Sequence, residues 1–265
     1  MSIKRYTANK DNTITNAFKE NLTTRATDAN MGASDIIEVF SIYGQAATSS
    51  TEQARALVEF PVSQITADRA ASTIPASGSV SFILKLTNAE HSSTTPSDFT
   101  LSVCPLTNAW SEGTGLDMEG YTDTGVSSWS YRVSGSSWGG ADGSFNAALR
   151  KDAAFSSGTE NLEVDISSIV EKWLDGTINN YGLLIKLSGS AENVVGGADP
   201  LAKKSYYTKK FFSRSSEFVL KRPIIEARFD NSTQDDRGDV IKSSSLAPAS
   251  DNLNNIYLYN KIRGN

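Results

Sequence analysis

The chain has 265 residues, a hydrophobic content of 38% and a formal net charge of −5 at pH 7. That length suffices for one large domain with an appendage, and the apolar residues can form a core. The negative charge disfavours nucleic-acid binding, because a phosphate-binding surface needs a basic stripe. No apolar run reaches the roughly eighteen residues of a membrane-spanning helix, so we expect no membrane insertion.

The first half of the chain is dominated by predicted strands. Apolar residues alternate with polar ones, which is the period of a half-buried strand. The middle of the chain, residues 107–148, is different: three of the four tryptophans stand there among many Gly and Ser residues, a composition typical of surface loops. The predicted strands are 1–6, a short strand within 7–34, 35–43, 54–65 (running into a turn), 79–87 and 98–106.

The stretch 162–187 has the clearest local pattern: a strand, a short amphipathic helix, a turn and a second strand. Asp165 or Ser167 can cap the start of the helix, which we place at about 167–175, and Gly176 follows its end. One helical face is apolar through positions i, i+3, i+4 and i+7, namely Ile166, Ile169, Val170 and Trp173.

The last part of the chain divides into a strand, a linker and a terminal segment. Residues 201–216 are basic and aromatic, and 217–229 predict a strand in which Pro223 favours an edge or a bulge. We therefore expect a β-sandwich domain over 1–230, a polar linker over 231–252 and a terminal segment over 253–265. That segment either pairs with a neighbouring chain or begins a further domain, and the predicted assembly residues are Ile256, Tyr257, Leu258 and Tyr259.

Catalytic patterns are weak throughout. His91 is the only histidine and Cys104 the only cysteine, which disfavours a Ser-His-Asp triad and a zinc site. The one enzymatic route left open is a carboxylate pair near Trp110, as a glycosidase would need, but a solvated acidic loop explains these residues better. We therefore predict a non-enzymatic protein. The acidic residues concerned are Glu112, Asp117, Glu119 and Asp123.

Two kinds of binding site are candidates. Tyr121, Trp129 and Trp138 lie in the Gly/Ser-rich loops, where exposed aromatic rings can stack on sugars; the competing interpretation is that the tryptophans belong to the core. Calcium is a candidate cofactor, because sandwich loops gather Asp and Asn oxygens. The nearest candidate ligands are Asp11, Asn30 and Asp35, although no EF-hand spacing is present.

The order of several short motifs resembles the DNRLRE-type domain, over roughly residues 3–230. The resemblance implies a β-sandwich of jelly-roll character, similar to carbohydrate-binding modules and without catalytic activity. The motifs are KDNTI (10–14), NMGAS (30–34), RALVEFPVSQI (55–65), FILKL (82–86), AWSEGTG (109–115), SSW (127–129), WGG (138–140), FFSRSSE (211–217) and RPIIEARF (222–229), together with the stretch 162–187.

The N-terminal residues contain no apolar stretch of a secretory signal peptide. Domains of this family usually occur in secreted chains, yet this sequence shows no export signal. An extracellular type of domain made without such a signal fits a tailed-bacteriophage virion protein. We therefore expect a protein that folds in a host cytoplasm and is released by lysis. Two functional hypotheses follow. The first is a structural virion protein, in capsid, neck or tail, present as a homo-oligomer or in multiple copies. The alternative is a carbohydrate-binding module that recognises a polysaccharide such as a host glycan.

Overall fold

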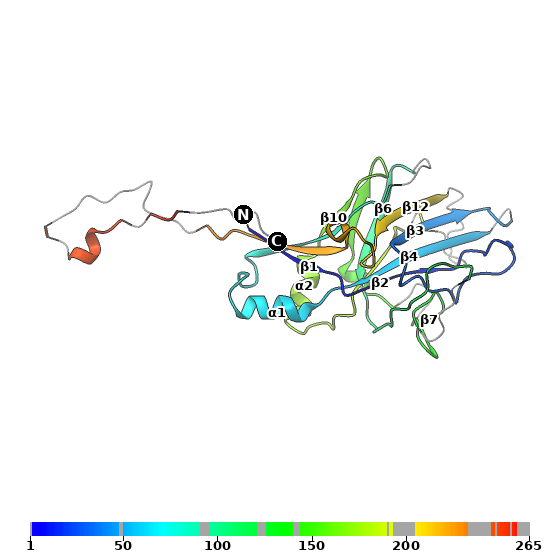
Figure 1. The fold of residues 1–265 in the computed structure, drawn as a ribbon, viewed down its shortest axis with the longest axis horizontal. Helices are drawn as coiled ribbons and strands as arrows, with labels where there is room; N and C mark the ends of the chain where they lie inside the picture. Colours follow the sequence, from blue (N-terminus) through cyan, green and yellow to red (C-terminus); the bar gives the residue numbers. More distant parts are fainter. Residues whose placement is uncertain are drawn as a thin grey trace. The chain divides into compact units, whose positions relative to one another are not determined.

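The computed structural model describes residues 2–47, 50–90, 96–120, 126–139, 144–189, 191–192, 205–232, 245–246, 248–254 and 256–258. Contacts divide the chain into two units. One unit is Ile3–Phe229, and the other combines Met1–Ser2 with Asp230–Asn265. The larger unit is rich in strands (Figure 1).

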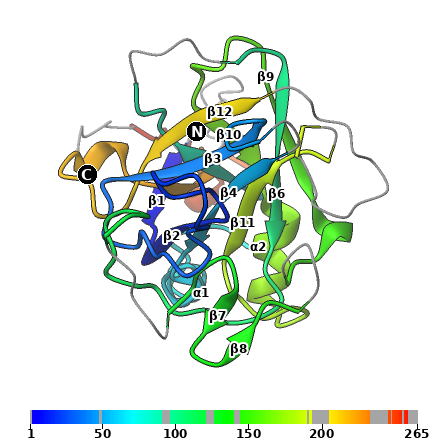
Figure 2. The same cartoon turned by 90° about the vertical axis from the view of Figure 1, so that its right-hand side faces the viewer.

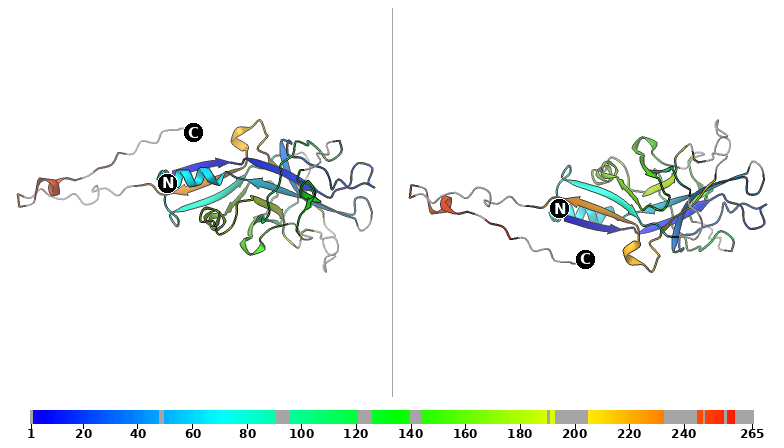
Figure 3. Two further views of the ribbon diagram at one scale, coloured as in Figure 1. Left: turned by 90° about the horizontal axis from the view of Figure 1, so that it is seen from below. Right: turned by 90° about the horizontal axis from the view of Figure 1, so that it is seen from above.

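Two antiparallel sheets make up most of the larger unit. The smaller sheet has the order β1 (Ser2–Thr7), β13 (Ile224–Phe229), β5 (Val80–Leu86) and β10 (Leu162–Asp165); the first three lie side by side in Figure 3. The larger sheet, which is curled, has the order β12 (Tyr206–Phe212), β3 (Ile36–Tyr43), β4 (Thr51–Glu59), β11 (Leu183–Leu187), β6 (Phe99–Pro105) and β9 (Lys151–Phe155), with β2 (Lys10–Thr15) also paired to β4 (Figure 2). A short hairpin joins β7 (Tyr131–Val133) to β8 (Ser136–Ser137).

The main core lies between the two sheets. In β5, alternate side chains from Val80 to Leu86 are buried, which is the predicted period of two. Ile225 and Ala227 of β13 join them from the neighbouring strand. The larger sheet contributes to the same cluster from its inner face, for example through Val58 and Ile185. The expected all-β antiparallel sandwich is therefore confirmed.

The predicted helix is present as α2 (Ser167–Leu174) and packs against β5. Its buried side chains are Ile169, Val170 and Trp173, the apolar face that the sequence indicated. The N-cap position is Ile166, which makes no side-chain cap bond, whereas the preceding Asp165 carboxylate accepts a hydrogen bond from Ser167 N (2.8 Å). Gly176 has a φ of +78° after the helix end, a conformation that favours glycine.

A second helix, α1 (Val62–Ala70), was not predicted, and its first four residues replace the end of the strand and turn expected over 54–65. Only Ile65 of this helix is buried, so the sequence shows no amphipathic period there. The Arg69 guanidinium holds the Glu171 carboxylate of α2 in a two-point ion pair (2.8 and 2.7 Å). Among the described residues, neither helix is long and apolar enough to cross a membrane.

The predicted strand over 217–229 is shorter than expected. It begins only at Ile224, after a 3-10 turn and after Pro223, which has no N–H to donate to a sheet. Strand β9 was not predicted at all. The described 3-10 turns are Ala147–Leu149, Val219–Lys221 and Ala249–Asn252.

Trp173 should be the main packing contact of α2. It is 6% exposed, and its Nε1 is buried without a hydrogen-bond partner. Trp173→Ala is expected to lower the free energy of unfolding by about 3–5 kcal/mol, measured by urea denaturation. Trp173→Phe is the control, since it keeps most of the apolar surface and removes the unpaired N–H, and it should lose much less. Equal, small losses in both variants would contradict this role.

Candidate functional site

The tryptophan loops form a third layer on the outer face of the larger sheet. Leu57 of β4 and Leu184 of β11 belong to a second apolar cluster, separate from the main core. Trp110 and Trp138 lie over them, 3% and 9% exposed. Each indole N–H donates to a backbone carbonyl, Trp110 to Tyr181 (2.9 Å) and Trp138 to Ser128 (2.8 Å). These tryptophans are therefore core residues of the outer layer.

This placement bears on the predicted sugar-binding aromatics. Trp138 is buried and has no free ring face to stack on a sugar. Trp129 is half-buried, packs against the same apolar cluster and has the Arg55 guanidinium 4.9 Å from its ring centroid. Tyr121 lies outside the described residues. The burial of Trp138 fits the competing core interpretation, because the loops cover an apolar sheet face. For the half-buried Trp129, sugar stacking stays a prediction.

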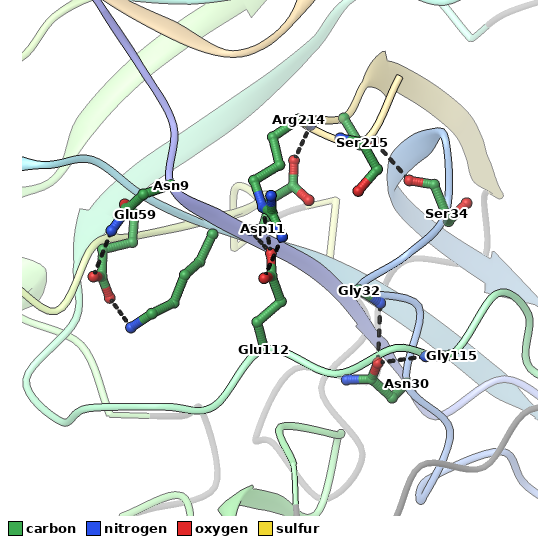
Figure 4. Close-up of polar contacts among 12 residues, drawn as sticks. Asn9, Asp11, Asn30, Gly32, Ser34, Glu59, Glu112, Gly115, Arg214 and Ser215 are labelled. Carbon is green, nitrogen blue, oxygen red and sulfur yellow. Dashed lines mark hydrogen bonds and ion pairs between the residues drawn. The ribbon is translucent and has the colours of Figure 1, made fainter. Parts of the chain in front are cut away.

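A polar cluster lies beside this layer, formed by Asp11, Glu112 and Arg214 and called here the acid–arginine cluster (Figure 4). Arg214 donates to Glu112 through Nε (2.8 Å) and Nη2 (2.5 Å). Asp11 N also donates to Glu112 (2.7 Å), and Arg214 N donates to Asp11 Oδ2 (2.5 Å). The cluster joins β2, the segment after Trp110 and the turn after β12.

Asp11 is the unusual member of the acid–arginine cluster. It is 1% exposed, and its Oδ1 is buried without a hydrogen-bond partner. Burial raises the pKa of Asp11 to about 7; the hydrogen bond from Arg214 N opposes the shift, and the nearby Glu112 carboxylate adds to it. In contrast, the hydrogen bond to Glu112 raises the pKa of Arg214 above its ordinary value. The cluster therefore holds a carboxyl that titrates near neutral pH.

Next to it, two asparagine side chains satisfy loop backbone groups. Asn30 Oδ1 accepts from Gly32 N (3.0 Å) and Gly115 N (3.2 Å), and Asn30 Nδ2 donates to Ser127 O (2.8 Å). Asn12 Nδ2 donates to the same carbonyl (3.0 Å). A Cβ at Gly113 would overlap the Asn30 side chain, so only glycine fits there.

Several of the sequence motifs converge on this region. Asp11 and Asn12 come from the motif at 10–14 and Asn30 from that at 30–34, while the remaining partners come from 109–115, 127–129 and 211–217. The sequence identified these motifs as marks of a fold. It did not predict the pairing of Glu112 with Arg214, which are 102 residues apart. The order of the motifs was the only available signal.

The predicted calcium ligands do not assemble into a recognisable site. Asn30 Oδ1 already accepts two N–H groups, and Asp11 Oδ2 accepts one. Asp35 is exposed. Within the described part of the chain, no group of three or more His, Cys, Asp or Glu side chains is placed to hold a metal ion. The structure thus gives the calcium hypothesis no support.

The other acidic residues considered for catalysis serve local contacts where they are described. Asp117 accepts hydrogen bonds from Glu119 N and Gly120 N (both 2.8 Å), and the Glu119 carboxylate accepts one from Glu20 N.

Cys104 is buried as expected, and burial raises its pKa to about 11. Asp123 and His91 lie outside the described residues.

The predicted assembly residues are exposed. Ile256 is 58%, Tyr257 44% and Leu258 91% exposed, and Leu253 shortly before them is 68% exposed. Residues 253–254 and 256–258 form no strand in the single chain. Tyr259 lies outside the described residues.

A scan of known family models finds no match to the sequence, and no curated protein matches it either.

The titration of Asp11 predicts a pH-dependent stability. Its folded pKa of about 7 lies above the ordinary value of 3.8, so between these values the folded state keeps a proton that the unfolded state releases. Its contribution is complete below about pH 4 and is lost as the pH rises through about 7. Asp11→Asn cannot titrate and should gain stability relative to wild type as the pH rises across this window, measured by urea unfolding. Asp28→Asn, at an exposed site, is the control; a constant difference between Asp11→Asn and wild type would contradict the assignment.

Proposed function

We propose that the chain is a non-enzymatic structural protein of a tailed-bacteriophage virion, joined to its neighbours by its C-terminal segment. The observation that carries the proposal is the exposure of large apolar side chains in that segment. Leu253, Ile256 and Leu258 are 68%, 58% and 91% exposed within six residues. Burying such a side chain contributes about 1.5–3 kcal/mol, so this segment gains most by binding another surface.

In such an assembly, the sandwich would provide the sheet edge that the C-terminal segment binds. A sheet edge offers unpaired N–H and C=O groups to an added strand, and alternate side chains of that strand enter pockets. The described residues 253–254 and 256–258 have the apolar content of such a strand and form no strand in the single chain. We infer that the sheet edge of a neighbouring copy receives this segment. The virion setting rests on the resemblance of the sequence motifs to DNRLRE-type domains and on the exposed apolar residues of the C-terminal segment, which suit a component of a larger assembly.

Removal of residues 231–265 should prevent association. The full chain is expected to form a concentration-dependent oligomer in light scattering after size exclusion, whereas the truncated chain should be monomeric. Leu253→Ser combined with Leu258→Ser should weaken the oligomer in the intact chain. Leu220→Ser is the matched control, because Leu220 is 93% exposed but belongs to the sandwich unit. A monomeric full chain, or equal masses for all variants, would refute the proposal.

A second candidate function, carbohydrate binding, is favoured by a pocket of about 230 Å³ at the ends of β6 and β11. Tyr181 supplies a half-buried ring, and Asn146 and Asn179 supply amide groups. An aromatic face combined with amide and hydroxyl groups suits a sugar residue. The lining residues are Pro105, Leu106, Thr107, Asn146, Gly176, Thr177, Ile178, Asn179 and Tyr181.

Tyr181→Ala should abolish glycan binding if the pocket has this role. The Tyr181 backbone carbonyl, which accepts from Trp110, is kept in this variant, so the fold should persist. Binding is measured on a glycan array and then by calorimetry with the best ligand. Tyr131→Ala is the control, since Tyr131 is 47% exposed and does not line the pocket. Absence of wild-type binding to every glycan would exclude this second function.

A further inference from the structure

Lys209 of β12 is buried, at 3% exposure. Its Nζ lies 4.7 Å from the ring centroid of Phe155 and 5.2 Å from that of Phe211. The rings keep water from the amine. Burial lowers the pKa of Lys209 to about 8, against the opposing charge of Glu160, so a neutral fraction exists near physiological pH.

Three oxygen atoms surround this Nζ. They are Glu160 O (2.6 Å), Gly158 O (3.0 Å) and Oδ1 of Asn88 (2.7 Å). The ammonium form donates to all three. A neutral amine has only two N–H groups and one lone pair. Because the two backbone carbonyls are fixed acceptors, they take both N–H groups, and the lone pair then faces the Asn88 carboxamide.

The backbone on both sides of Asn88 is held against β12. Phe212 N donates to Thr87 O (3.1 Å), and Ala89 N donates to Lys210 O (2.9 Å). Since a C=O bond is about 1.2 Å long, the Asn88 Cγ lies at most about 3.9 Å from Lys209 Nζ. That is close to the roughly 3–3.5 Å at which reacting atoms are aligned for attack.

We propose that Lys209 and Asn88 form an intramolecular amide bond. The neutral Nζ attacks Cγ, and the electron pair of the C=O bond moves onto Oδ1. Nζ loses one proton, which passes to Nδ2, since both nitrogens are then bonded to the same tetrahedral Cγ. The C=O bond re-forms, the Cγ–Nδ2 bond breaks and ammonia leaves. The product amide keeps one N–H, which can donate to either backbone carbonyl. No oxidant, metal or co-reactant is needed.

The bond would join the two sheets. Lys209 belongs to the larger sheet, while Asn88 lies two residues after the end of β5 in the smaller sheet. The linked residues are 121 positions apart, so the closed loop would contain β6 to β11 with α2. Such a link suits a protein under mechanical load, although the proposal does not depend on the assembly role proposed above.

Intact-mass spectrometry of the purified full chain tests the proposal directly. The wild type should be lighter than its sequence by one ammonia molecule, and a tryptic digest should contain a branched peptide joining Lys209 to Asn88. Asn88→Ala and Lys209→Arg should have their full sequence masses. Asn88→Asp should instead lose one water molecule, because a carboxyl then replaces the carboxamide.

Lys210→Arg is the matched control. Lys210 is adjacent but pairs with Glu38 (3.2 Å), so this variant should retain the loss of ammonia. Circular dichroism checks the folding of each variant. An unmodified wild-type mass after long incubation of the folded protein at pH 8, where more of the amine is neutral, would overturn the proposal. So would loss of ammonia that persists in Asn88→Ala.

Discussion

The larger sheet is apolar on both faces, and much of the architecture follows from that constraint. In β4, Val58 faces the main core while its neighbour Leu57 faces outward, and Leu184 of β11 joins Leu57. One cover cannot bury both faces. The smaller sheet and α2 cover the inner face, and Trp110 and Trp138 cover the outer one. The long loops are therefore a structural layer.

Covering a sheet with loops creates a second problem, because loop backbones carry polar groups that no ladder satisfies. Asn12 and Asn30 solve it locally by bonding to the backbone of neighbouring loops. The acid–arginine cluster does the same over a longer range. The positive charge of Arg214 balances the negative charge of Glu112 in an ion pair. The cost of removing Asp11 from water is not fully offset, because its Oδ1 has no hydrogen-bond partner. A proton on Asp11 relieves that cost, which explains the raised pKa.

The sequence predicted what is periodic and missed what is not. Alternation located β3, β5 and β6, and the helical spacing of Ile166 to Trp173 located α2. Helix α1 was not predicted, because Ile65 is its only buried side chain and one apolar position sets no helical period. The partners of Asp11 were not predicted. They lie 101 and 203 residues away in the sequence, and residue spacing does not predict contacts at such separations. The sequence left the tryptophans open between exposed binding rings and core residues, because it does not show that the outer face of the larger sheet, with Leu57 and Leu184, is apolar and needs a cover.

The connectivity of the strands places the contact between Lys209 and Asn88 on the route by which a load would pass between the two sheets. A pull on the C-terminal segment acts at Asp230, directly after β13, and β13 pairs with β5 through all its residues from Ile224 to Phe229. Load therefore passes into β5, whose chain continues to Asn88. Without a covalent tie, the next connection from Asn88 to the larger sheet is a few hydrogen bonds to β12. The amide bond proposed between Asn88 and Lys209 would lie at that junction, where load would pass from one sheet to the other.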